Sequence, residues 1–214
     1  MDKGGRKAHS FSDLLITKKG GQMTTDYVPK EIFSRILEAL TPQNALVLEL
    51  CMGSGMRISD ALSMTYDEAM GMLCSGSTRY HYTEKKTGKE RDASVPSDWL
   101  CRALDQYNPK SDWLFAGRDP QKHRTRQAVW KDLHRAAKLY RVNGQRLRAR
   151  IGPHTARKIY AVGLYHEAAE NGSEDPLGAV MDDLNHSDPA VTFVYALADV
   201  ISARKRDLRQ KNRS

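Results

Sequence analysis

Residues 153–157 read Pro-His-Thr-Ala-Arg, and residues 184–195 read Leu-Asn-His-Ser-Asp-Pro-Ala-Val-Thr-Phe-Val-Tyr. The first segment directly follows Gly152, and a proline after such a break is typical of the first position of a helix. His154 and Arg157 lie three residues apart, and residues at that spacing share one face of a helix. Both side chains can therefore point at one ligand, and the free amides of the first helical turn favour an anion there.

The second segment places His186 nine residues before Tyr195, with Thr192 one helical turn before the tyrosine. Taken alone, a tyrosine in a helix is an ordinary core or half-buried residue. A phenol, with an ordinary pKa of about 10, is a poor nucleophile until cations stabilise its anion. The role of Tyr195 therefore depends on whether the chain supplies cations nearby.

Positive charge is concentrated in one stretch of this chain. The 214 residues include 34 Lys+Arg and 26 Asp+Glu, which gives a formal net charge of +8. Residues 122–150 contain ten cations and a single acid, Asp132, so this stretch carries +9. A solvated helix face usually interleaves acids with its bases. The pattern therefore favours a surface that contacts a phosphate backbone.

Two further cations stand out upstream. Arg57 follows the sequence Gly-Ser-Gly-Met, whose glycines let the backbone and a long side chain approach a ligand closely. A surface pair with Asp60, three residues later, is the alternative role of Arg57. Lys86 lies in the turn of a predicted hairpin, where a lysine is solvated by default. From a flexible hairpin, however, Lys86 can also reach into a DNA groove and protonate a leaving oxygen.

The cysteines and the N-terminus bear on the cellular setting. Cys51, Cys74 and Cys101 are scattered without a CxxC pair, which argues against a disulfide framework and a zinc site. Cys51 lies in an apolar run and is expected to be buried. The polar N-terminus lacks a signal-peptide pattern, and no apolar run approaches membrane-spanning length. We expect a cytoplasmic protein with no metal, no cofactor and no membrane partner.

The order of patterns predicts one domain at residues 25–214, preceded by a basic, flexible tail at 1–24 with a short helix around residues 11–16. The domain is expected to be mainly α with a small antiparallel β-sheet, an α+β fold. Strands at 78–83 and 91–95 flank a hairpin turn in which Gly88 is free to adopt a positive φ. Helices are predicted from Pro29 and from Pro42, as a turn at 57–62, and at 97–107, 125–140, 154–170, 176–184, 188–197 and 198–211.

Taken together, these motifs resemble those of the tyrosine recombinase (phage integrase) family. The matching segments are Gly-Met-Arg57-Ile-Ser-Asp60, Lys86-Thr-Gly, Pro-His154-Thr-Ala-Arg157 and Leu-Asn-His186-x8-Tyr195. Each motif alone is weak, but six matching residues in order at family-like spacing are specific. The resemblance spans residues from about 27 to 200. It implies a catalytic set of Arg57, Lys86, His154, Arg157, His186 and Tyr195.

The resemblance implies a site-specific DNA recombinase that integrates, excises or inverts DNA without a metal. Tyr195 is expected to attack a scissile phosphate and form a 3′-phosphotyrosyl link. Arg57 and Arg157 are expected to hold the non-bridging oxygens. The expected roles of the other three are general acid for Lys86, general acid/base for His154 and hydrogen-bond donor to the phosphate for His186.

The chain departs from the family pattern at three places. Asn185 stands where the family usually has glycine, and because asparagine tolerates a positive φ we expect the turn to survive. Lys158 follows Arg157 where the family often has histidine, which adds a cation. The family's core-binding domain has no room ahead of Arg57. We therefore expect the catalytic domain alone, either a separated domain or a naturally short member.

Double-stranded DNA is the expected partner, and the resemblance implies a homotetramer on two duplexes that exchanges C-terminal segments, with a monomer in the absence of DNA. In the last stretch Val200, Ile201 and Leu208 form either a docking stripe for a neighbour or a face that packs on its own domain; both interpretations stay open. The expected DNA contacts are Lys122, Arg124, Arg126, Lys131, Arg135, Arg146, Arg148, Arg150 and Lys158.

Two alternative functions are compatible with these residues. The first is a type IB topoisomerase-like relaxation of DNA, with the same tyrosine chemistry but strand rotation in place of strand exchange. The second is a catalytically idle DNA-binding regulator of the same fold. The presence of all six expected catalytic residues counts against the second, since an idle site has no need of the full set.

Overall fold

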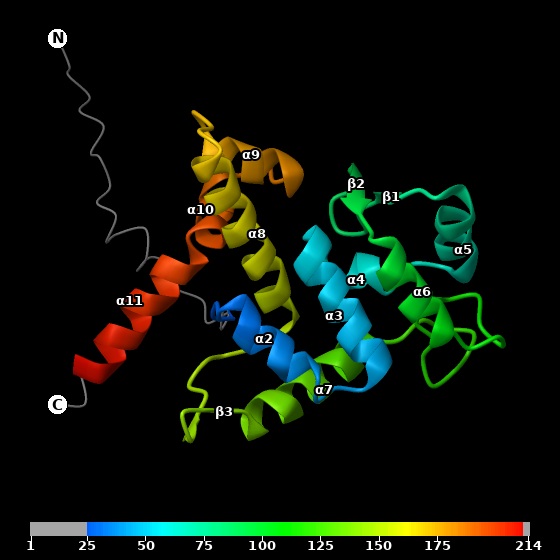
Figure 1. Ribbon diagram of the computed structural model, residues 1–214, viewed down its shortest axis with the longest axis horizontal. Helices are drawn as coiled ribbons and strands as arrows, with labels where there is room; N and C mark the ends of the chain where they lie inside the picture. The colour runs from blue at the N-terminus through cyan, green and yellow to red at the C-terminus, as the bar shows by residue number, and fades with distance from the viewer. Residues whose placement is uncertain (1–24, 212–214) are drawn as a thin grey trace, which may run out of the picture.

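The computed structural model describes the backbone of residues 25–211 and the side chains of residues 25–204. The predicted tail and its short helix lie outside the described residues. Two helices, α3 (Pro42–Ser54) and α8 (Pro153–Glu170), pack against each other at the centre of the molecule, and the remaining elements surround this pair (Figure 1). The prediction of a mainly helical α+β fold is confirmed.

Helix α3 is apolar on nearly all sides, and the core includes Cys51, which is 1% exposed, as predicted. Thr41 precedes α3 at the N-cap position, but its side chain makes no capping hydrogen bond within the helix. The Thr41 amide and the Asn44 side chain instead donate to Asp132 of α7 (Arg126–Leu139), at 2.9 and 2.8 Å. Burial raises the pKa of Asp132, but these hydrogen bonds outweigh burial and lower it to about 2. The one acid of the basic stretch thus joins α7 to the start of α3.

The predicted hairpin is present, with strands β1 (Arg79–Thr83) and β2 (Glu90–Ser94) in antiparallel register. Tyr80 and Tyr82 of β1 are buried while the residues between them are exposed, which is the period-two pattern of a sheet with one covered face. The turn contains Gly88 at φ 68°, as predicted. Strand β2 packs on α3, which places the hairpin beside the central helix pair.

The C-terminal helices form a second, smaller core around α8. Helices α9 (Pro176–Asp183) and α10 (Pro189–Ala196) pack on α8 and on each other, and Tyr195 packs against this cluster. Between the two helices, Asn185 adopts φ 54°, so the prediction that asparagine would preserve the turn is confirmed. This turn directs the following residues back toward α8.

Helix α11 (Ala198–Lys211) begins on its own domain. Ser202 Oγ accepts from the Tyr27 amide at 2.9 Å, and His166 of α8 contacts Asp199 at 3.1 Å. Of the predicted stripe, Ile201 is 9% exposed and packs on this domain, whereas Val200 is 52% exposed. The Leu208 side chain lies outside the described side chains. Beyond this contact α11 points away from the body (Figure 1).

Three elements were not predicted from the sequence. Helix α5 (Tyr66–Ser75) begins with a reciprocal capping box between Thr65 and Glu68, and the pair β3 (Arg141–Val142) and β4 (Gln145–Arg146) forms a second two-stranded sheet. Strands of two residues are too short to show a hydrophobic period. The remaining helices are α2 (Lys30–Leu37), α4 (Ile58–Ala61) and α6 (Ser97–Asp105). None of the helices described between residues 25 and 211 is long and apolar enough to cross a membrane.

Candidate active site

Arg157 lies at the centre of the site, in the second turn of α8, and is 2% exposed. Its guanidinium donates to the Gly55 carbonyl, to the Leu184 carbonyl at 2.8 Å, and to His186 Nε2 at 3.2 Å. Burial, followed by the neighbouring cation Arg57, lowers the pKa of Arg157 to about 10. Neutral backbone oxygens from two distant segments therefore fix this buried charge in place.

Gly55 permits this arrangement because of its backbone conformation and its surroundings. The residue ends α3 at φ 65°, a left-handed conformation that side chains other than glycine rarely adopt. A Cβ atom at Gly55 would lie 2.5 Å from the Tyr160 ring and 2.8 Å from Leu184. The close approach of α3 to α8, and with it the contact to Arg157, depends on the absence of that atom.

His186 lies between Arg157 and α10. Because arginine can only donate, His186 Nε2 is the acceptor, so the proton is on Nδ1, which faces Thr192 Oγ1 at 3.2 Å. Burial, then the charges of Arg157 and Arg57, lower the pKa of His186 to about 4. The imidazole is therefore neutral at pH 7, and Thr192, one helical turn before Tyr195, lies beside the site.

Tyr195 and His154 make the contact that brings α10 to the start of α8. The Tyr195 hydroxyl lies 3.3 Å from His154 Nδ1, and its ring meets the His186 ring edge-on at 5.4 Å between centroids. Burial raises the pKa of Tyr195, although Arg157 and Arg57 oppose the rise. Desolvation of the His154 ring, followed by the charge of Arg157, lowers the pKa of His154, although the residue is exposed at the surface. A protonated phenol thus faces a neutral imidazole.

Arg57 precedes α4 and has a side chain that is 13% exposed. It forms an ion pair with Glu84, whose side chain is fully buried at the end of β1. The sequence alternative of a surface pair between Arg57 and Asp60 is wrong: Asp60 is 1% exposed and accepts from the Lys85 amide at 3.1 Å. Burial raises the pKa of Asp60. Two buried carboxylates therefore lie beside Arg57, one on α4 and one on the hairpin.

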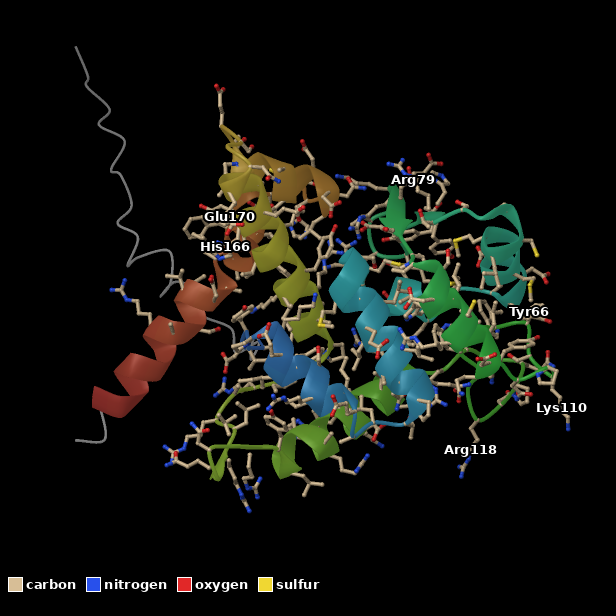
Figure 2. All side chains as sticks on the ribbon, viewed as in Figure 1. Tyr66, Arg79, Lys110, Arg118, His166 and Glu170 are labelled. Carbon is tan, nitrogen blue, oxygen red and sulfur yellow. The ribbon has the colours of Figure 1, made fainter. Side chains whose placement is uncertain are left out.

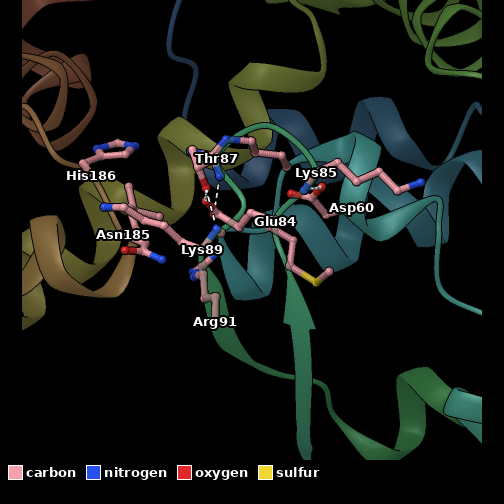
Figure 3. A network of polar contacts seen from close by, with 12 residues as sticks. Asp60, Glu84, Lys85, Thr87, Lys89, Arg91, Asn185 and His186 are labelled. Atoms are coloured by element: carbon pink, nitrogen blue, oxygen red, sulfur yellow. Dashed lines mark hydrogen bonds and ion pairs between the residues drawn. The ribbon is translucent and has the colours of Figure 1, made fainter.

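The hairpin that carries Lys86 reaches toward the loop that carries His186 (Figure 3). Lys86 itself is exposed, and its charge contributes to the lowered pKa of His154. Lys89 Nζ donates to Ser187 Oγ at 3.0 Å, and Asn185 Nδ2 donates to the Glu90 carbonyl at 3.1 Å. These contacts hold the hairpin against the loop between α9 and α10.

Five of the six expected catalytic residues belong to one site. His154, Arg157, His186 and Tyr195 are connected by direct contacts or ring packing. Arg57 acts on Tyr195 by charge. The sixth, Lys86, lies on the adjoining hairpin, within electrostatic range of His154. Sequence reasoning missed Glu84 and Arg91. Glu84 continues the alternation of buried Tyr80 and Tyr82, and an acid at a buried strand position is a signal that could have found it.

Arg91 is the second missed residue, and it connects the hairpin to two neighbouring helices. It is 7% exposed and donates to Tyr82 Oη at 3.1 Å, to the Ser54 carbonyl at 2.8 Å and to the Asp183 carbonyl at 2.7 Å. One side chain therefore joins β2 to α3 and α9. No sequence motif announces such a role, because its partners lie far away along the chain.

The predicted DNA-contact cations divide into two groups. Lys158 is 7% exposed and its ammonium contacts the Thr25 carbonyl, while Arg124 donates to Gln43 at 2.6 Å and to Asn44 at 3.2 Å. Both side chains therefore lie against the protein, which argues against the prediction that they contact DNA. The remaining predicted cations are exposed, on α7 and the segments that flank it: Lys122, Arg126, Lys131, Arg135, Arg146, Arg148 and Arg150. Of these, Arg135 also pairs with Asp132 at 2.7 Å and donates to the Ala39 carbonyl at 3.0 Å.

The start of α7 adjoins the site. Arg126, Trp130 and His154 line a cavity of about 270 Å³, and the Arg126 charge contributes to the lowered pKa of His154. Trp130 is 45% exposed and stacks on His134 with 4.7 Å between ring centroids. The basic surface thus continues to the edge of the site. Across the described part of the chain, no group of three or more His, Cys, Asp and Glu side chains is arranged to hold a metal ion.

Known proteins resemble this chain in sequence and in fold. A tyrosine recombinase XerD from Oceanobacillus iheyensis is 28% identical over 218 residues, which cover 91% of this chain and 64% of that protein. The chain therefore spans less than two thirds of the length of this curated relative. The catalytic domain of bacteriophage HP1 integrase superposes with a TM-score of 0.51 at 19% identity, covering 82% of this chain and 89% of that one.

A second solved structure has the same fold. The XerH site-specific recombinase, in a pre-cleavage complex with its difH substrate, superposes with a TM-score of 0.55 at 18% identity. The match covers 79% of this chain and 49% of that one. The model of the phage integrase family matches residues 8–200, which is most of the chain and includes every motif residue described above. The chain therefore belongs to the phage integrase family of tyrosine recombinases.

Proposed function

We propose that this chain is a site-specific DNA recombinase that cuts and rejoins DNA through a 3′-phosphotyrosyl intermediate on Tyr195. The observation that carries the proposal is the 3.3 Å contact between the Tyr195 hydroxyl and His154 Nδ1, beside Arg157 and His186. A phenol, a neutral imidazole and a fixed guanidinium in one place are the groups that attack on a phosphodiester needs. Membership in the family supports the same chemistry.

In the proposed first step, the Tyr195 oxygen attacks the scissile phosphorus and the bond to the 5′ oxygen breaks. The phenolic proton passes to His154 Nδ1, and Lys86 protonates the leaving 5′ oxygen. A new phosphodiester joins the tyrosine to the 3′ end. Because this link conserves the bond energy, the 5′-hydroxyl of a second strand can reverse the step without ATP.

The phosphate would be bound by charges that differ in mobility. Arg157 is a fixed, buried charge, and Arg57 presents a more accessible guanidinium to the non-bridging oxygens. His186 accepts from Arg157, so donating to a phosphate requires the other tautomer or the protonated ring. A bound phosphate favours both of these forms, because it places negative charge beside the ring.

The exposed cations of α7 and residues 141–150 would bind the phosphates of the DNA backbone and direct the DNA toward this site. Relatives of the same fold were solved on DNA: XerH on its difH substrate and the Tn1549 integrase on circular intermediate DNA. Because contacts to phosphates release counterions, each one steepens the salt dependence of binding. The Arg146→Gln/Arg148→Gln pair is expected to weaken binding and to reduce the slope of log K against log salt by about 2.

A matched control is available at the other end of the molecule. Arg79 of β1 and Lys110, which follows α6 along the chain, are exposed and lie far from α7's junction with β3 (Figure 2). The Arg79→Gln/Lys110→Gln pair removes the same charge and is expected to leave the slope unchanged. Equal slopes for both pairs would show that binding depends on net charge and not on the α7 surface.

The proposed assembly is a homotetramer on two duplexes, in which C-terminal segments are exchanged between neighbours. Support comes from α11, whose first turns pack on this domain while the rest points away from it (Figure 1). Val200 supplies exposed apolar surface on the same helix. Sedimentation with and without a bound site is expected to show a DNA-dependent tetramer; a monomer on every substrate would contradict this arrangement.

Covalent trapping on randomised DNA tests the reaction and identifies its site in one experiment. The protein is incubated with randomised duplexes that carry a nick, so that the short fragment released by cleavage diffuses away and the reaction stops at the adduct. Adducts are isolated on a denaturing gel and the attached DNA is sequenced. We expect the wild type to select a defined sequence and Tyr195→Phe to form no adduct.

The control is Tyr165→Phe, a half-buried tyrosine that packs against the same small core as Tyr195. This variant is expected to form adducts like the wild type. No adduct with the wild type, or equal amounts with Tyr195→Phe, would overturn the proposal and favour the idle regulator. Relaxation of supercoiled DNA without joining of two duplexes would favour the topoisomerase-like alternative.

A further inference from the structure

Glu84 is a buried acid in a site that is otherwise cationic. Its side chain is 0% exposed, and it follows β1 on the strand face that buries Tyr80 and Tyr82. One carboxylate oxygen forms an ion pair with Arg57, and the other accepts from Thr87 Oγ1 at 2.6 Å. Figure 3 shows this carboxylate where the hairpin turn begins. A buried charge is costly unless it is paired, so the buried carboxylate of Glu84 requires a physical explanation.

The two arginines of the site differ in what holds them. Arg157 is fixed by two backbone carbonyls and His186. Within the described residues, the ion pair with Glu84 is the polar contact that the Arg57 guanidinium makes. Arg57 is therefore held by direct contact with one carboxylate, while Asp60 acts on it by charge alone, whereas Arg157 is held mainly by the main chain.

The same carboxylate lies at the base of the turn that carries Lys86. The Glu84 amide donates to the Lys89 carbonyl at 2.9 Å, and the Glu84 carbonyl accepts from the Gly88 amide at 2.8 Å. The Thr87 hydroxyl, one residue after Lys86, donates to the Glu84 side chain. Glu84 thus contacts both the arginine on α4 and the turn of the hairpin, through its side chain and its main chain.

We propose that Glu84 is a positioning residue that fixes the Arg57 guanidinium relative to the Lys86 turn, so that both meet one phosphate. This proposal rests on the function proposed above. Arg57 would bind a non-bridging oxygen while Lys86 protonates the leaving oxygen, and the carboxylate between them sets their separation. Glu84 does not contact the DNA in this account; it acts through Arg57 and the turn.

Glu84→Gln tests this role while keeping the side-chain shape. The amide can still accept from Thr87, but it no longer carries the charge that holds Arg57. Misplacing a catalytic group by about 1 Å costs about 100-fold in rate, so we expect adduct formation at saturating DNA to slow by about 10- to 100-fold. DNA affinity is expected to change little. Glu90→Gln, an acid on β2 with a side chain 75% exposed, is the matched control and should retain the wild-type rate.

A double-mutant cycle with Arg57→Lys separates positioning from general damage. If Glu84 acts through Arg57, then Glu84→Gln slows the reaction far less in the Arg57→Lys background than in the wild type. Equal effects in both backgrounds would overturn the proposal, since a merely structural loss does not depend on Arg57. Should Glu84→Gln fail to fold, Thr87→Val removes the other contact to the carboxylate from an exposed position, and the same cycle applies.

A substrate with sulfur at the bridging 5′ position adds a second readout, because a thiolate leaves without a proton. Lys86→Met is expected to recover on this substrate, whereas Glu84→Gln is expected to recover only in part, because the Arg57 defect persists. Wild-type rates for Glu84→Gln on the ordinary substrate would overturn the positioning role. Failure of the wild type to form any adduct would instead overturn the proposed function, so the two failures are distinguishable.

Discussion

The α8–α10 side of the site and the hairpin side each hold one arginine, but with different chemical groups. On the α8 side, Arg157 is 2% exposed and is held by main-chain carbonyls. On the hairpin side, Arg57 is held by the buried side chain of Glu84. A charge held by carbonyls keeps its full positive field, whereas a charge held by a carboxylate is partly neutralised until an anion arrives. The comparison indicates a rigid half and an adjustable half of one phosphate site.

Removing each arginine gives the largest expected effect and tests this difference directly. Arg57→Met leaves Glu84 buried without its cation, which is expected to cost about 3–5 kcal/mol of unfolding free energy. Adding Glu84→Gln should recover most of that loss. Arg157→Met leaves two carbonyls unsatisfied, at about 1–3 kcal/mol each, and Glu84→Gln should not recover it.

Urea unfolding of the four variants gives the comparison. Rescue of Arg57→Met and Arg157→Met to the same extent would show that Glu84 serves the net charge of the site and not a specific partner. Absence of rescue in both would show that the hairpin tolerates an unpaired carboxylate, and the contrast between the two halves would fail.

The next effect concerns Gly55, where the two halves meet. Gly55→Ala forces a side chain into a left-handed conformation, which costs about 1–2 kcal/mol before any clash with Tyr160 and Leu184 is counted. We expect lower stability and a loss of adduct formation, since the displaced carbonyl no longer holds Arg157. Gly53→Ala, in the last turns of α3 with open space around its Cβ, is the matched control. It should be neutral or stabilise by about 0.5–1 kcal/mol, and similar losses at both glycines would contradict the steric account.

The smallest effect is the pH dependence of stability. The pKa of His186 is lowered to about 4, so the folded protein favours the neutral ring, while the unfolded chain binds a proton near the ordinary value of about 6.5. Stability from His186 is therefore present above pH ~6.5 and is lost as pH falls toward 4; solvent screening of the half-buried ring reduces the loss to about 1 kcal/mol at pH ~5.5. Thermal melts above pH ~6.5 and at pH ~5.5 should show that His186→Asn loses less stability than the wild type on acidification, with His134→Asn as the control. An unchanged drop would contradict the buried, neutral imidazole.

Local features of the fold followed from the sequence. The hairpin, the start of α8 with His154 and Arg157, and the positive φ of Asn185 each depend on a few neighbouring residues. The position of Thr192, one helical turn before Tyr195, depends only on the spacing within α10. Short-range periodicity and turn chemistry carry such information because their partners are close along the chain.

The contacts that orient the charges did not follow from the sequence. Arg57 reaches Glu84, and Arg157 reaches the Gly55 carbonyl, across separations that only tertiary packing sets. The basic stretch predicted a charged surface, but long side chains can turn either way, and Arg124 and Lys158 contact the protein. Charge patterning indicates the presence of cations, while burial decides which of them are available to a partner.

The most direct test of the proposed chemistry is to identify the amino acid that is joined to DNA. Trapped adducts would be digested with nuclease and protease, and the modified peptide would be sequenced by mass spectrometry. We predict one nucleotide-bearing peptide, with the 3′ phosphate on Tyr195 and a free 5′-hydroxyl on the released strand. A phosphate on any other residue, or a released strand that keeps a 5′ phosphate, would contradict it.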